Sequence, residues 1–291
     1  MNVIEEPIIF DCGGSRLLGI LHRPETPRHR AVLIVVGGPQ YRVGSHRQFL
    51  HLARDLAADG TPVLRFDYRG MGDSDGSAVS FEDTESDIRA AIDLLCDRVP
   101  ELTDVVIWGL CDAVSAALFY AYRDARVTGL VLANPWVRTD ESIARTYMQH
   151  YYRSRVLSPD LWKRLLTGKV EVFSRVAEFW QTLRAARVSA GEAKNEPASP
   201  VERQPDQQVS YTERMLQGFE RFTGRVLLII SGDDLVAAEF NDHVAASTAW
   251  QAALNRSGVQ RRALAEANHT FSRQAWRNQV TDWTNEWLKS W

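Results

Sequence analysis

Short apolar runs alternate along most of the chain with longer stretches of helical period. The runs are rich in β-branched residues, as buried strands are, and the alternation predicts a mostly parallel sheet covered by helices. The predicted strands are Ile8–Asp11, Leu17–His22, Ala31–Val36, Pro62–Phe66, Val105–Trp108, Gly129–Ala133, Arg225–Ile230 and Gln260–Leu264. The predicted helices are Ser45–Asp59, Phe81–Arg98, Asp112–Arg123, Val236–Asn255 and Arg273–Ser290. The turn Cys12-Gly13-Gly14-Ser15 should join the first two strands as an antiparallel hairpin.

The regular spacing breaks once, between the strands that end near Ala133 and begin near Arg225. About 90 residues lie there, far more than the dozen or so that a crossover needs. Three stretches of helical period come first, at 142–155, 160–166 and 169–187, and a polar, proline-containing segment follows at 189–210. We therefore expect a helical lid at 137–223, with 189–210 flexible, between core segments 1–136 and 224–291. The alternative is a structural insertion with no part in substrate binding.

Composition and charge narrow the class of protein. The 34 basic and 37 acidic side chains leave a net charge of −3, which argues against a nucleic-acid partner. Apolar residues make up 45% and charged residues 24%, the balance of a globular protein. We find neither a signal peptide nor the roughly 18 apolar residues that a membrane span requires. Together with only three cysteines, this predicts a reduced, cytoplasmic protein without a membrane span.

The segment Val105–Ala113 carries the strongest chemical signal. A strand leads into Gly109-Leu110-Cys111-Asp112-Ala113 and then into a helix, with small residues two positions before and after Cys111. This is the spacing of a nucleophile elbow, although the usual motif has Ser at the centre and Gly two residues later. We expect Cys111 to project from the carboxyl end of its strand, where the helix N-terminus favours a thiolate. Cys12 and Cys96 we interpret as packing residues.

A base and an acid follow at the positions that this chemistry requires. His269 comes after the last predicted strand, and Asp233 and Asp234 come after the strand before it. In the α/β-hydrolase arrangement the chain order is nucleophile, acid, histidine, so Cys111, Asp234 and His269 form the predicted triad, with Asp233 as the alternative acid.

Acyl transfer also needs two donors for the oxyanion. We expect the N–H groups of Asp112 and Gly38 to supply them, with Gln40 behind Gly38, because Pro39 has no N–H. The Asp112 carboxylate could contact the substrate or act on the thiol through its charge. The loop that carries Asp67 and Arg69 should brace the rim through charged hydrogen bonds.

At these residues the chain resembles the α/β-hydrolase superfamily over nearly its whole length. More narrowly, Gly37–Ser45, Gly109–Ala113 and Ser231–Leu235 with Glu239-Phe240 resemble the first group of exosortase-A-associated hydrolases. The resemblance implies an α/β-hydrolase fold and a Cys-dependent hydrolase or acyltransferase in bacteria that make exopolysaccharide. It does not imply that exosortase is a physical partner.

We therefore predict an enzyme that cleaves an ester, thioester or lactone of a small acyl substrate through an acyl-Cys111 intermediate. Two alternatives stay open: an acyltransferase onto a sugar or carrier, and a non-catalytic binding module that keeps the fold. The seven histidines show no ligand spacing, so we expect no metal and no cofactor. The oligomeric state is not indicated by the sequence.

Overall fold

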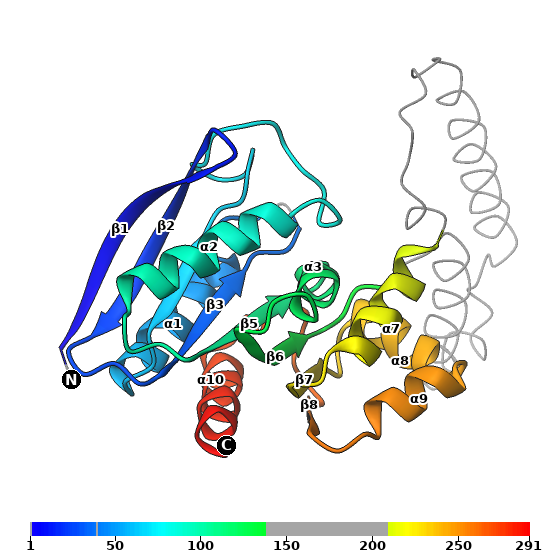
Figure 1. Ribbon diagram of the computed structural model, residues 1–291. Coiled ribbons are helices and arrows are strands. Elements are labelled where there is room, and N and C mark those ends of the chain that lie inside the picture. The colour runs from blue at the N-terminus through cyan, green and yellow to red at the C-terminus, as the bar shows by residue number, and fades with distance from the viewer. Residues whose placement is uncertain (1, 39, 138–208) are drawn as a thin grey trace, which may run out of the picture. The chain divides into compact units, whose positions relative to one another are not determined.

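Eight strands form one sheet in the order β1-β2-β4-β3-β5-β6-β7-β8 in a computed structural model that describes residues 2–38, 40–137 and 209–291 (Figure 1). The strands are β1 (Val3–Cys12), β2 (Ser15–Pro24), β3 (Arg30–Val35), β4 (Val63–Phe66), β5 (Asp104–Leu110), β6 (Val127–Ala133), β7 (Arg225–Ser231) and β8 (Val259–Leu264). β2 is antiparallel to β1 and to β4, and the remaining neighbours are parallel. The predicted eight-stranded, mostly parallel sheet is confirmed, and so is the hairpin, whose turn pairs Cys12 with Ser15.

Helices cover both faces of this sheet. The described helices are α1 (Gln48–Ala58), preceded by a 3-10 turn at Ser45–Arg47, then α2 (Glu85–Arg98), α3 (Ala113–Ala121), α7 (Tyr211–Arg221), α8 (Leu235–Ala245), α9 (Thr248–Leu254) and α10 (Gln274–Lys289). α1 and α10 pack together on one face, while α3 packs with α2 and α7 on the other. None of the helices described is long and apolar enough to cross a membrane.

One helix prediction is wrong in a way that has a local cause. The stretch Val236–Asn255 forms two helices, because the chain turns at Ser247 and the Ser247 hydroxyl caps the second one by accepting from the N–H of Trp250 at 3.3 Å. Such a cap cannot be predicted from helical period alone, because apolar residues continue at helical spacing on both sides of Ser247.

The insertion ends earlier than the sequence suggests. Helix α7 lies within the range 137–223 that we expected to be the lid, yet its Met215 and Phe219 are buried in the core against α3. The core unit resumes at Val209 rather than at residue 224. The three helices predicted between 142 and 187, and nearly all of the segment 189–210, lie outside the described residues, so the lid stays a prediction.

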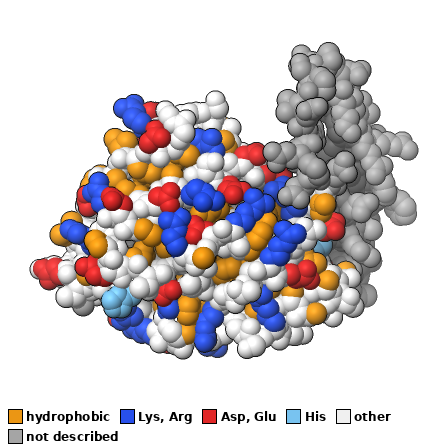
Figure 2. Space-filling view, viewed as in Figure 1, with side chains coloured by type: hydrophobic (Ala, Val, Ile, Leu, Met, Phe, Trp, Pro, Cys, Tyr) orange, Lys and Arg blue, Asp and Glu red, His pale blue; other side chains and the backbone are white. Residues whose placement is uncertain are grey.

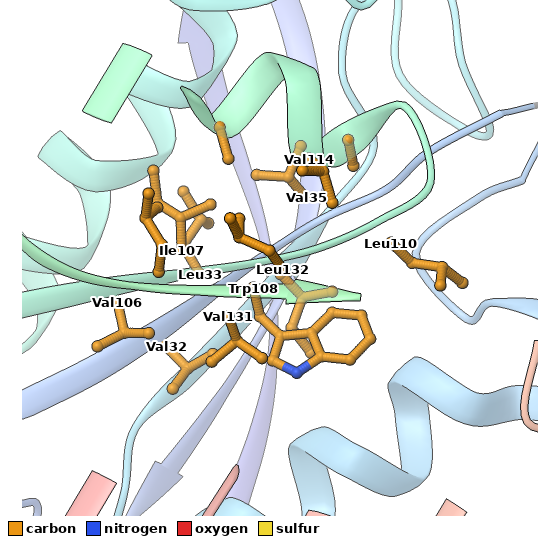
Figure 3. Packing of buried hydrophobic residues seen from close by; sticks show 14 of the residues in the cluster. Val32, Leu33, Val35, Val106, Ile107, Trp108, Leu110, Val114, Val131 and Leu132 are labelled. Carbon is orange, nitrogen blue, oxygen red and sulfur yellow. The ribbon is translucent and has the colours of Figure 1, made fainter. Parts of the chain in front are cut away.

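The core lies on both sides of β5, the strand that leads to the elbow. Side chains alternate along it, and Figure 3 shows Val106 and Trp108 on one side and Ile107 on the other, the side on which Val114 of α3 lies. All four are at most 2% exposed. Trp108 meets Phe49 of α1 edge to face, with 5.7 Å between the ring centroids. Burial on both faces explains why β5 is a nearly continuous apolar run. The packing on both faces also fixes the position of the end of the strand, where Cys111 follows.

Charged side chains of both signs are interspersed on the face of the molecule in Figure 2. The described residues also form exposed charge pairs, such as Arg123 with Glu85 at 2.8 Å and Arg126 with Asp93 at 2.7 Å. Exposed pairs of this kind contribute little to stability, so the apolar sheet layers rather than the surface charges hold this fold together.

Candidate active site

Cys111 lies in the sharp turn between β5 and α3, at the carboxyl edge of the sheet. Its φ of 64° is in the left-handed region, which is costly for a residue with a side chain. The turn is held from both sides, because the Cys111 N–H donates to the Ala133 carbonyl at 3.0 Å and its own carbonyl accepts from Val114 at 3.1 Å. A Cβ on Gly109 would come within 2.9 Å of the Ala113 carbonyl oxygen. The small residues around Cys111 thus have the steric role expected of an elbow.

His269 lies between two of the predicted groups. Its Nδ1 is 2.7 Å from Oδ2 of Asp234, and the side chain of Cys111 is close enough to raise the pKa of its ring. The Asp234 side chain is 5% exposed and the His269 side chain 28% exposed. The structure therefore brings together Cys111, His269 and Asp234, which lie on three separate loops of the carboxyl edge.

Helix α8 decides which aspartate reaches the histidine. Asp234 is the N-cap of α8, where its carboxylate accepts from the N–H groups of Val236 at 3.1 Å and Ala237 at 3.3 Å. These bonds orient the same carboxylate toward His269. Asp233 is exposed, and its backbone N–H donates to the Ala267 carbonyl at 3.0 Å.

The electrostatic surroundings of His269 favour its protonated form. Burial alone would lower the pKa of His269, but the hydrogen bonds and negative charges of Asp234 and Cys111 outweigh burial and raise it to about 10.

One of the two expected oxyanion donors, the N–H of Gly38, already has an acceptor beside the elbow. The N–H of Gly38 donates to Oδ1 of Asp112 at 2.7 Å. Burial raises the pKa of the Asp112 carboxyl, while the N–H groups of Gly38, Asp112 and Ala113 and the charge of His269 act in the opposite direction. The N–H of Gln40 donates to the Gly38 carbonyl at 2.8 Å, so it is used within its own loop.

The loop that holds Gly38 is braced by the loop after β4. Asp67 is buried, pairs with the guanidinium of Arg42 and also accepts from the Arg42 N–H at 2.6 Å. Arg69 in turn pairs with the buried carboxylate of Asp87 at 2.9 Å. The predicted bracing role of Asp67 and Arg69 is confirmed by these charged hydrogen bonds.

A buried polar network behind the histidine escaped the sequence reasoning. Asn134, directly after β6, is fully buried and has a φ of 44°. Its amide nitrogen donates to the His269 carbonyl and to the Ser231 hydroxyl, both at 2.9 Å, and its amide oxygen accepts from the Ser231 N–H at 2.8 Å. The Ser231 hydroxyl donates to the Asn268 carbonyl at 3.0 Å. The available signal was a polar residue placed directly after an apolar strand that ends at the site.

The part of the chain that the structure describes contains no candidate set of metal ligands. No group of three or more His, Cys, Asp or Glu side chains among those residues is arranged to hold an ion.

The order of the strands and the sharp turn between β5 and α3 are those of the α/β-hydrolase fold. Residues 27–271 match the family described as serine aminopeptidase, S33, and the chain belongs to this hydrolase family. The elbow motif usually has Ser at its centre, where this chain has Cys111. No curated protein matches the chain significantly.

Solved structures of similar fold include several hydrolases. An esterase of Pyrococcus furiosus superposes with a TM-score of 0.64 at 16% identity, covering 99% of this chain and 93% of that one. Est1E of Butyrivibrio proteoclasticus with bound ferulic acid gives 0.61 at 16% identity, with 97% and 98% covered. A dienelactone hydrolase of Anabaena variabilis gives 0.59 at 16% identity, with 100% and 99% covered. At these identities the likeness concerns the fold.

Proposed function

We propose that this protein is a Cys-dependent hydrolase that cleaves esters, thioesters or lactones through an acyl-Cys111 intermediate. The observation that carries the proposal is the left-handed turn at Cys111, beside a histidine whose Nδ1 is 2.7 Å from Oδ2 of Asp234. This is the arrangement of an activated nucleophile, its base and the group that orients the base.

The groups support a two-step reaction. His269 takes the thiol proton, the sulfur of Cys111 bonds to the substrate carbonyl carbon, and the carbonyl electron pair moves onto oxygen. When that oxyanion collapses, the bond to the leaving group breaks and His269 returns the proton to the leaving group. Water then attacks the acyl-Cys with His269 as base, which releases the acid and restores the thiol.

Ester, thioester and lactone carbonyls suit a thiol nucleophile better than amides do. A tetrahedral adduct of a thiolate expels whichever group leaves more easily, and a poor leaving group returns the adduct to thiolate and substrate. Esterases and a lactone hydrolase among the proteins of similar fold support the same substrate range. From the resemblance to exosortase-A-associated hydrolases we further propose an acyl substrate connected with bacterial exopolysaccharide.

The test is covalent labelling of the thiol. The protein is incubated with a panel of acyl thioesters, p-nitrophenyl esters and lactones, and the acyl adduct is detected by intact mass. We expect an adduct that Cys111→Ala abolishes and that Cys96→Ala, a matched change of another partly buried thiol, leaves intact. An adduct that forms equally in Cys111→Ala would contradict the proposed nucleophile.

Product analysis separates hydrolysis from acyl transfer. A hydrolase releases the free acid at the same rate whether or not a sugar alcohol is added. If acylated sugar accumulates and little acid is formed, the enzyme is an acyltransferase that uses the same intermediate.

A further inference from the structure

The carboxylate of Asp112 occupies the place where an oxyanion would be bound. In this fold the donors for the oxyanion are the N–H of the residue after the nucleophile and an N–H from the loop after an early strand. Here these are the N–H groups of Asp112 and Gly38. The Gly38 N–H donates to Oδ1 of Asp112 at 2.7 Å; burial raises the pKa of this carboxyl, and the N–H groups of Asp112 and Ala113 act against that rise.

The surrounding residues leave a fitted space for this carboxylate. A Cβ at position 37 would lie 2.4 Å from Oδ1 of Asp112 and 2.3 Å from the Leu110 carbonyl oxygen, so the site needs Gly37. The backbone of Asp112 is ordinary right-handed helix, with φ −69° and ψ −20°. Its side chain is therefore not forced inward by a strained backbone, and the 2.7 Å bond is in the range of charge-assisted hydrogen bonds.

A carboxylate in this position opposes acylation of Cys111. The developing oxyanion and the carboxylate are both negative, and they need the same N–H donors. Loss of a single oxyanion donor lowers turnover about 100- to 1000-fold in a serine protease of known mechanism. As long as the Asp112 carboxylate stays in place, the N–H of Gly38 is not available to the oxyanion of the substrate, which is equivalent to the loss of one donor.

We propose that Asp112 is an inhibitory residue of this site, whose carboxylate binds the oxyanion donors of the resting enzyme and must be displaced before a substrate can acylate Cys111. The inference rests on the proposed function and adds a determinant of substrate choice to it. Only an acyl group whose binding displaces the carboxylate is turned over efficiently. Small activated esters, which make few other contacts, should react slowly with the wild-type enzyme.

The test compares two reactions of the same thiol. Acylation by p-nitrophenyl acetate needs both the thiolate and the oxyanion donors, whereas alkylation by iodoacetamide needs only the thiolate. The ratio of the two rate constants therefore reports on the donors, and any effect of the Asp112 charge on the thiol itself cancels. We expect this ratio to rise about 100-fold in Asp112→Ala, which empties the space. A smaller rise is expected in Asp112→Asn, whose amide oxygen can still accept from Gly38.

Added acetate supplies a second readout. In Asp112→Ala, millimolar acetate should enter the vacated space and inhibit acylation without slowing alkylation. In the wild-type protein the space is filled, so acetate should change neither rate.

An unchanged or lower ratio in both variants, or acylation of Asp112→Ala that is insensitive to acetate, overturns the inhibitory role while the proposed function stands. If Cys111 is alkylated normally but no ester or thioester acylates the wild type or either variant, the proposed function fails and the inhibitory role fails with it. Should Asp112→Ala not fold, the isosteric Asp112→Asn carries the comparison, and a ratio equal to that of the wild type then overturns the proposal.

Discussion

Asp234 has two separable roles, and one substitution distinguishes them. Its carboxylate caps helix α8 through the N–H groups of Val236 and Ala237, and it accepts a 2.7 Å hydrogen bond from Nδ1 of His269. Asparagine caps a helix about as well as aspartate does. Asp234→Asn therefore keeps the cap and removes the charge that faces His269, whereas Asp234→Ala loses both and should cost about 1 kcal/mol more in stability than Asp234→Asn.

The size of the effect follows from the hydrogen bond that is weakened. A hydrogen bond to a charged partner contributes about 1.5–3 kcal/mol, and about 1.4 kcal/mol corresponds to a factor of ten in rate. We expect Asp234→Asn to slow acylation of Cys111 by about 10- to 150-fold. The pKa of His269, about 10 in the wild type, should fall toward its ordinary value of 6.5.

The sign of the pH dependence separates loss of charge from loss of structure. The wild-type imidazolium persists until the pH approaches 10, whereas in Asp234→Asn it is lost at lower pH, so the deficit should grow as pH rises from 6.5 toward 10. The assay is the single-turnover acylation rate over this range, with titration of His269 followed by NMR. Asp233→Asn is the matched control and should behave like the wild type. Equal losses in the two variants, or an unchanged His269 titration in Asp234→Asn, would refute the reasoning.

Three further predictions concern stability. Because Cys111 has a φ of 64°, Cys111→Gly should unfold with a free energy about 1 kcal/mol higher than that of Cys111→Ala in urea, and equal values would exclude strain at the elbow. Burial holds the pKa of His22 at about 4, below its ordinary 6.5. The unfolded chain therefore binds the extra proton, so stability is complete above pH 6.5 and falls by about 3 kcal/mol as pH drops to about 4. His22→Gln, which can still accept from Arg65, should flatten this pH dependence of the urea midpoint, and an unchanged slope would contradict the assignment. Asn134→Ala removes three buried hydrogen bonds and should lower the free energy of unfolding by about 3 kcal/mol while slowing acylation through the loop of His269. A loss below about 1 kcal/mol would show that water replaces them.

The strands and the elbow could be predicted because their signals are local. A buried parallel strand must be apolar along its length, and the turn at Cys111 must have small neighbours, so adjacent residues carry both requirements. The buried parallel strands β3, β5, β6 and β7 were found for this reason. The break at Ser247 and the core helix α7 were missed, because a single cap and the packing of Met215 against α3 change no helical period.

The residues of the site show the same difference between what local sequence predicts and what long-range packing decides. The sequence determined which residue types reach the carboxyl edge of the sheet, since each follows a strand, and it named Cys111, His269 and a pair of aspartates. Only the tertiary structure decided that Asp234 rather than Asp233 faces His269. The carboxylate of Asp234 is oriented by capping helix α8, and in that orientation it meets a histidine that lies 35 positions further along the chain.

The same holds for the carboxylate of Asp112, which meets the N–H of Gly38 from 74 positions away, and for Asn134, which supports the loop of His269 from the end of β6. Local sequence encodes backbone propensity and burial. Which donor meets which acceptor depends on how distant loops come together when the sheet packs, and no short stretch of the chain contains that information.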